Sequence, residues 1–215
     1  MKKLWVIARK DIREAFRSRS VIIYIILLFF LTFTYFNSYN AAVNRIGQDA
    51  SPDVFSQISQ AFINNIFGTL PMMYSVLICS VFAAYAVIVE KTRRNLESLM
   101  AAPVSLNQIW LGKALAVTVP SYVIALGVTV LAYVVMSFVA VEPRVGSFII
   151  PDATAIVTAI VIIPVLVFLV VAIVTYLQLV ISNPRIANIA FTVIFLALYF
   201  GVTALAQLGV AIDFM

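Results

Sequence analysis

Charged residues divide the chain into long apolar stretches. Five stretches contain no Asp, Glu, Lys or Arg, and each has at least the ~20 residues that an α-helix needs to cross ~30 Å of hydrocarbon. Their hydrophobicity is continuous, whereas strands of a membrane barrel alternate with a period of two. The pattern therefore predicts five membrane-spanning helices. The stretches cover residues 20–44, 54–89, 114–141, 153–184 and 186–212.

The charges and turn residues between the stretches give the boundaries of a single transmembrane domain, residues 1–215. Ser51, Pro52 and Asp53 are typical of the N-cap and first two positions of a helix that leads into the second span. The predicted fold class is an all-α polytopic membrane protein, with an N-terminal amphipathic interfacial helix and about five transmembrane helices. In chain order the segments are a cytoplasmic surface helix (1–19), a first span (20–40), an outer loop and helix (41–61), a second span (62–89), a cytoplasmic loop (90–105), a third span (106–140), an outer loop (141–153), a fourth span (154–181), an inner turn (182–186) and a fifth span (187–211).

Composition and charge support this class and set its orientation. With 64% hydrophobic and 11% charged residues, a soluble domain would expose large apolar patches. Twelve of the fourteen basic residues lie on the side of the N-terminus, and only Arg45 and Arg144 lie opposite. Because short loops rich in Lys and Arg stay in the cytoplasm, we expect a multi-pass protein of the cytoplasmic membrane with its N-terminus inside and its C-terminus outside. The net charge of +5 follows from this asymmetry, so no nucleic-acid partner is expected.

Few residues suit catalysis or metal binding, and we expect neither. The chain has no histidine and a single cysteine, Cys79, which is expected to be a packing residue. The usual zinc ligand sets and the Ser/His and Cys/His nucleophiles are thereby excluded. A P-loop is excluded because the one Gly-Lys pair, Gly112-Lys113, has Asn107 at the required upstream glycine and Ala114 after the lysine. The uncharged stretches argue against a proton-coupled carrier or a channel with a charged filter.

The N-terminal segment has the pattern of a helix lying on the membrane surface. At 100° per residue, one face carries apolar side chains and the other carries cations. Such a helix buries its apolar face at the headgroup boundary, and its cations meet anionic lipid. The pattern fits a topogenic anchor and also a docking surface for a partner. The candidate residues are Trp5, Arg9, Arg13, Phe16 and Arg17.

The segment between the second and third spans is short and charged. Leu96, Leu99 and Met100 fall at i, i+3 and i+4, which predicts an apolar stripe on a short helix that ends at Pro103. Ser105 is typical of an N-cap, and Gln108 three residues later would complete a capping box at the start of the third span. The segment fits an ordinary cytoplasmic loop as well as a contact site for a partner.

At these residues the sequence resembles the permease subunits of ABC-2 type ABC transporters. In that family an acidic-basic pair, Leu-Glu-x-Leu, Pro-hydrophobic-Ser and Gly-Lys join the second and third spans. Here Glu90-Lys91, Leu96-Glu97-Ser98-Leu99, Pro103-Val104-Ser105 and Gly112-Lys113 occupy those places, and residues 7–19 are similar to the family's elbow helix. The family usually has a sixth span. Its absence here implies either a five-span variant or a shortened chain.

The resemblance implies the permease of an ATP-driven exporter, working as a homodimer with two separate ATP-binding subunits. Those subunits would bind ATP and Mg, and this chain would bind no cofactor and hydrolyse no ATP. Residues 91–103 would form the coupling helix. The alternative is a non-transporting membrane scaffold or sensor that recruits a cytoplasmic partner with the same loop. The expected coupling residues are Glu90, Lys91, Arg93, Arg94, Leu96, Glu97, Leu99, Met100 and Pro103.

Small, polar and proline residues within the spans give further candidates. Ala197 and Gly201 form a small-x-x-x-small pair that fits a dimer contact, which the family resemblance places at the first and fifth spans, and equally fits packing within one chain. Pro71, Pro120 and Pro164 are expected to bend their spans, as structural kinks or as hinges. Polar residues could line a substrate path or bond to a neighbouring helix, and the candidates are Thr32, Asn64, Asn65, Thr69, Asn188, Thr192 and Gln207.

Overall fold

The structure, a computed structural model, confirms the all-α class. It describes residues 9–14, 16, 17, 19–46, 52–83 and 105–180, with the isolated positions 189, 193 and 197, and no strand occurs among them. The elements are α2 (Arg19–Ile46), α3 (Pro52–Ala83), α6 (Leu106–Met136), the π-helix η2 (Ser137–Val141), α7 (Glu142–Val145), α8 (Ala153–Val157), the π-helix η3 (Thr158–Ile162) and α9 (Ile163–Val180).

Four helices of this part of the chain are long and apolar enough to cross a membrane, and they overlap the first four predicted spans. The predicted inner turn and fifth span lie outside the described residues, except for 189, 193 and 197, which are helical. The division into segments of one domain therefore stays a prediction. The four long helices cover Val21–Arg45, Asp53–Ala83, Asn107–Val145 and Ala153–Gln178.

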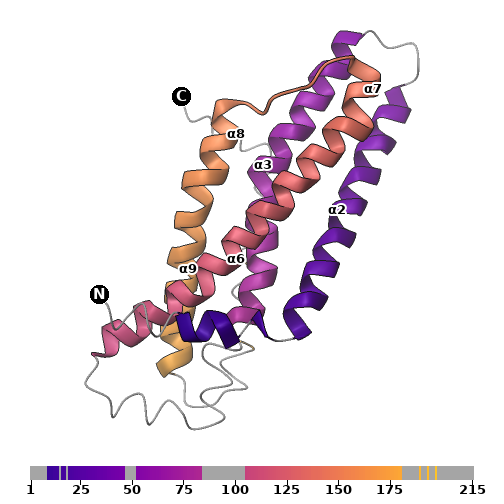
Figure 1. Cartoon of the computed structure of the whole chain (residues 1–215). Coiled ribbons are helices and arrows are strands. Elements are labelled where there is room, and N and C mark those ends of the chain that lie inside the picture. The colour runs from indigo at the N-terminus through magenta and orange to yellow at the C-terminus, as the bar shows by residue number, and fades with distance from the viewer. Residues whose placement is uncertain are drawn as a thin grey trace.

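The helices lie side by side in an elongated bundle (Figure 1). We call the end that holds residues 9–17, Ala83 and Ser105 the basal end, and the end that holds Arg45 and Asp53 the distal end. α3 and α6 form the centre of the bundle, α2 packs on α3, and α9 packs on α6. The predicted coupling loop would therefore leave and re-enter the bundle at its basal end.

The sequence of α6 explains its central position. Ala114, Ser121, Ala125 and Ala132 lie on one stripe of this helix, and all four are buried. Small side chains let helix backbones approach closely, which matters in lipid because no hydrophobic force drives helices together there. α3 supplies larger side chains to the same core, and its fully buried members include Ile63, Ile66, Tyr74 and Ile78.

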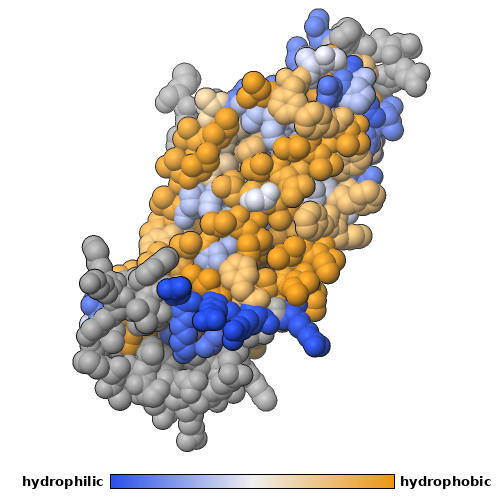
Figure 2. All heavy atoms as spheres, viewed as in Figure 1, coloured by the Kyte–Doolittle hydropathy of each residue, from blue (hydrophilic) through white to orange (hydrophobic). Residues whose placement is uncertain are grey.

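The outside of the bundle is apolar along most of its length. Exposed Ile, Leu, Val and Phe side chains cover α2, α6 and α9. Figure 2 shows this apolar band on one face, with hydrophilic residues at both of its ends. A belt of this kind matches the hydrocarbon of a bilayer between two polar surfaces. The described helices thus form a multi-pass membrane bundle.

Two π-helical turns interrupt the long helices, and a proline follows each of them by two residues. η2 precedes Pro143, and η3 precedes Pro164. Proline has no N–H to donate to the preceding turn, and π turns are a recognised local adjustment in membrane helices. The sequence predicted a bend at Pro164, and the structure accommodates this residue with a wider turn. Pro71 and Pro120 lie inside continuous α-helices.

The turn at η3 creates a carbonyl that needs a donor from another helix. The N–H of Ile163 donates to the Thr158 carbonyl, so it does not serve Ala159. The next nitrogen along the chain belongs to Pro164 and carries no hydrogen. The Tyr122 hydroxyl of α6 donates to the Ala159 carbonyl instead. A side chain of the third span therefore satisfies the backbone of the fourth.

Candidate functional site

The start of α6 is fixed by the capping box that the sequence predicts. The Ser105 hydroxyl accepts a hydrogen bond from the Gln108 N–H at 3.3 Å, and the Ser105 N–H donates to the Gln108 side-chain oxygen at 3.4 Å. Ile109, in the first turn, is buried. Because a reciprocal cap fixes the direction in which the chain enters a helix, the end of the predicted coupling loop has a defined position at the basal end.

The interfacial segment, residues 9–17, lies across the basal end of the bundle (Figure 1). Residues 9–14 and 16 are helical, and Arg9, Arg13, Phe16 and Arg17 are exposed, as a helix on a membrane surface requires. Figure 2 shows the hydrophilic residues of this segment along the lower edge of the apolar band. Trp5 lies outside the described residues.

One acidic residue of the interfacial segment is buried. The Asp11 carboxylate lies 3.2 Å from the Nζ of Lys113, and the two side chains are 3% and 0% exposed. Sequence reasoning missed this pair, although a signal was present. Asp11 lies one helical turn from Ala8 and Ala15, on the face that is otherwise apolar. An acid on the buried face of a helix indicates a cationic partner elsewhere in the fold.

α6 is also joined to α9 near the basal end. The indole Nε1 of Trp110 donates to the Ala172 carbonyl at 2.7 Å. The Trp110 ring meets Tyr176 edge to face, with centroids 6.0 Å apart. The first two turns of α6 therefore contact both the interfacial segment and α9.

Three polar contacts join α2 to α3, and the one between Tyr39 and Ser59 is buried. The Thr32 and Tyr74 hydroxyls lie 2.8 Å apart, as do those of Tyr39 and Ser59. The Tyr35 hydroxyl donates to the Asn65 side-chain oxygen at 2.6 Å, and Thr69 donates to the same oxygen at 2.9 Å. Hydrogen bonds between membrane helices help to fix which helices associate. Thr32, Asn65 and Thr69 thus make contacts between or within these helices.

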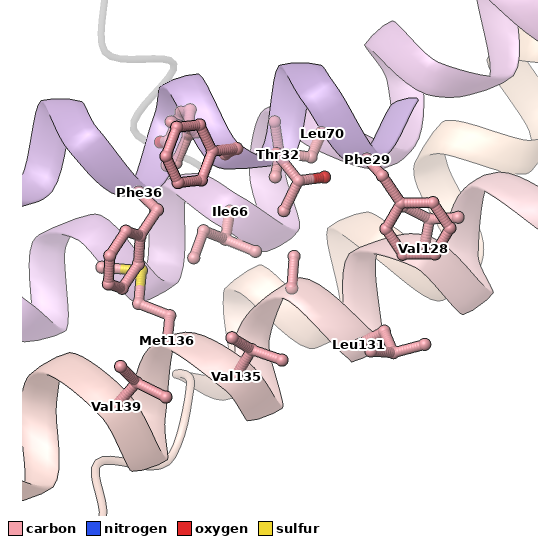
Figure 3. Close-up of a pocket in the computed structure, with 13 residues that line it drawn as sticks. Phe29, Thr32, Phe36, Ile66, Leu70, Val128, Leu131, Val135, Met136 and Val139 are labelled. Atoms are coloured by element: carbon pink, nitrogen blue, oxygen red, sulfur yellow. The ribbon is translucent and has the colours of Figure 1, made fainter. Parts of the chain in front are cut away.

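An apolar groove of about 340 Å³ lies between α2, α3 and α6. Figure 3 shows Phe29 and Phe36 facing Leu131, Val135 and Val139 across it. Thr32 is one of the few polar side chains on its wall, and its hydroxyl bonds to Tyr74 and to the Leu28 carbonyl. Several residues at its rim are exposed on the lipid-facing surface. The groove therefore suits hydrocarbon rather than a charged molecule.

A second, polar cleft of about 460 Å³ lies at the distal end and is lined by Gln60 and Asn64 of α3. Beside it, the Asp152 carboxylate accepts hydrogen bonds from both side-chain amides, that of Gln60 at 2.9 Å. The Asp152 N–H donates to the Asn64 oxygen at 3.0 Å. Gly146, with a φ of 73° that suits glycine, ends α7 and lets the chain turn toward Asp152. These contacts join α3 to the start of α8.

The polar residues that the sequence predicts to line a substrate path therefore lie in several different places. Thr32 lines the apolar groove, Asn64 lines the distal cleft, and Asn65 and Thr69 form a cluster with Tyr35. Ala197 is helical and exposed. The remaining candidates lie outside the described residues, and these are Asn188, Thr192, Gly201 and Gln207, together with the coupling residues Glu90, Lys91, Arg93, Arg94, Leu96, Glu97, Leu99, Met100 and Pro103.

Cys79 is fully buried in the hydrophobic core, as the sequence predicts. Within the described ranges, no group of three His, Cys, Asp or Glu side chains is placed to hold a metal ion. Some buried polar side chains, such as Ser59 and Lys113, join one element to another, and others, such as Ser121 and Thr129, bond to a carbonyl of their own helix. The features that stand out are thus those of a membrane bundle whose basal end is tied together by a short surface segment.

This architecture defines a multi-pass helical membrane protein. The family model described as ABC-2 family transporter protein matches residues 5–213, and the chain belongs to that family. It is accordingly a transmembrane subunit of an ABC transporter and not its ATPase, and such subunits work with an ABC ATP-binding partner. No curated protein matches this sequence.

Proposed function

We propose that this chain is the permease of an ATP-driven exporter, and that a separate ATP-binding subunit drives it through a coupling helix at residues 91–103. The arrangement of the basal end carries the proposal. α3 ends there, α6 begins there at a capped serine, and the interfacial segment lies beside both. A short charged loop that joins these helix ends would contact a cytoplasmic protein at the basal end.

The orientation follows from the charges. Ten of the basic residues lie in the N-terminal segment and the loop at 90–105, and a bilayer keeps such loops on the cytoplasmic side. The basal end therefore faces the cytoplasm, where ATP is. The five uncharged stretches of the sequence hold no Asp, Glu, Lys or Arg, which favours ATP over an ion gradient as the source of energy.

In the proposed complex, two copies of the chain pair with two ATP-binding subunits, which hold ATP and Mg. The two copies meet through the first and fifth spans, with Ala197 and Gly201 allowing close approach. When the ATP-binding subunits close, they displace the coupling helix. The capped start of α6 passes that displacement to the spans, because rigid secondary elements and packed side chains carry coupling between distant sites.

The test is to disrupt the coupling helix and measure the ATPase activity of the complex. Leu96→Asp places a charge on its apolar stripe, and Arg93→Glu with Arg94→Glu reverses its charge. Each variant is expected to lower ATP hydrolysis of the reconstituted complex to that of the isolated ATP-binding subunit, with membrane insertion intact. Arg45→Glu, at the distal end, is the matched control. Full ATPase activity in the coupling variants would contradict the proposal.

A further inference from the structure

The interfacial segment contacts both helix ends that flank the predicted coupling loop. At the end of α3, the Phe82 ring meets Phe16 edge to face, with centroids 5.4 Å apart and planes at 77°. Two turns into α6, Lys113 meets Asp11 at 3.2 Å. These contacts join positions that are 66 and 102 residues apart in the sequence. One short segment thus connects the helix before the loop to the helix after it.

The Asp11–Lys113 ion pair is buried, unlike other charged side chains of the segment. Arg9, Arg13 and Glu14 are exposed, whereas the Asp11 and Lys113 side chains are almost entirely removed from water. Buried charges persist in proteins when they are paired and hydrogen-bonded, because an isolated buried charge is strongly unfavourable. A buried ion pair therefore tolerates little separation of its partners. It resists relative movement of the two helices better than an apolar contact, which can slide.

We propose that Asp11 and Lys113 are positioning residues that join the interfacial segment to α6, so that residues 9–17, the end of α3 and the start of α6 move as one body. The proposal rests on the proposed function, since the displacement that it transmits comes from an ATP-binding subunit at the coupling loop. With the pair intact, a push on the loop moves the bases of both spans together. Without it, the interfacial segment no longer moves with the base of α6, and less of the displacement reaches the rest of the bundle.

A double-mutant cycle on the reconstituted complex tests the pair. Asp11→Asn and Lys113→Met each remove one charge, and Glu14→Gln removes an exposed carboxylate of the same segment as the control. Each single variant is expected to lower the kcat for ATP roughly twofold to thirtyfold, the range that residues along a coupling route produce. The KM for ATP and the amount of bound ATP-binding subunit stay unchanged, because the nucleotide site lies in the partner.

The double variant decides whether the two residues act as a pair. Since both substitutions remove the same contact, the double variant is expected to be no slower than the slower single variant. The proposal would be overturned if the single variants had the same kcat as Glu14→Gln. It would also be overturned if the fold-reductions in kcat of the two single variants multiplied in the double variant.

If a charge variant fails to assemble with the ATP-binding subunit, a distance measurement still tests the contact between the interfacial segment and α6. Spin labels at Arg13→Cys and Asn107→Cys, both exposed positions, are placed in a Cys79→Ala background. One narrow distance distribution, the same with and without ATP, is expected, and Lys113→Met broadens it. A distance that shifts with ATP in the parent complex overturns the proposal. If no ATP-binding subunit co-purifies, the proposed function fails. The labels still test the contact between the interfacial segment and α6 in the chain alone. There, equally broad distance distributions in the parent and in Lys113→Met overturn the further inference.

Discussion

The hydrogen bond from Tyr122 to the Ala159 carbonyl makes a quantitative prediction about stability. Tyr122→Phe removes the donor and keeps the ring, so it leaves a buried carbonyl without a partner. Hydrogen bonds between membrane helices contribute about 0.6 kcal/mol on average and about 1.7 kcal/mol at most, and a buried group left unsatisfied costs about 1–3 kcal/mol. We expect a loss of about 1–2 kcal/mol, or roughly 2–8 °C in unfolding temperature for a chain of this size.

The chain carries its own reporter for this measurement. Cys79 is its sole cysteine and is fully buried, so a thiol-reactive dye becomes fluorescent only when the core opens on heating. Tyr176→Phe, which removes a hydroxyl from an exposed side chain of α9, is the matched control and is expected to leave the unfolding temperature unchanged.

The backbone argument predicts how Tyr122 and Pro164 depend on each other. Pro164→Ala restores an N–H that can serve the carbonyl, so Tyr122→Phe should cost much less in that background. The two substitutions are therefore expected to be non-additive. An equal loss of unfolding temperature with and without Pro164, or no loss at all for Tyr122→Phe, would refute the account of η3.

Two further predictions concern the two ends of the bundle. Ser105→Ala removes the cap of α6 and is expected to lower the stability by about 1 kcal/mol in the same thermal assay, while Ser105→Asp keeps most of the stability of the parent. An alanine variant as stable as the parent would count against the capping box. Asp152→Ala removes the carboxylate that accepts from Gln60 and Asn64. Ile149 is buried beside the distal cleft, and Asp152→Ala is expected to speed the labelling of Ile149→Cys by an impermeant thiol reagent added from outside. The background is Cys79→Ala, and Asp53→Ala is the control. Labelling equally slow in both carboxylate variants would show that these bonds do not close the cleft.

The sequence predicted best the features that depend on neighbouring residues. Continuous hydrophobicity predicted the long helices, because a span must satisfy its own backbone and face lipid throughout. The capping box was predictable because Ser105 and Gln108 are three residues apart and bond to each other. Pro52 was predictable as the first residue of α3 because its ring suits the first turn of a helix.

The contacts that tie the bundle together were missed because they join residues far apart in the chain. Lys113 was recognised only as part of a Gly-Lys motif, and nothing in its own surroundings indicates Asp11. Asp152 falls in the predicted outer loop (141–153), and nothing near it in the sequence indicates that it accepts hydrogen bonds from α3. The π turn at η3 depends on a tyrosine in another helix as well as on Pro164. Such pairings are fixed by how the helices pack, which a single sequence does not specify.

The most direct test of the central claim asks what the basal loop touches in the assembled complex. A photo-crosslinking residue placed at Leu99, in the predicted coupling helix, should capture an ATP-binding protein with a P-loop when the complex is irradiated in its membrane, and ATP should alter the yield. The same residue placed at Ser147, at the distal end, should capture none. Capture of a partner that binds no nucleotide, or labelling of Leu99→Cys from outside the cell, would contradict the account.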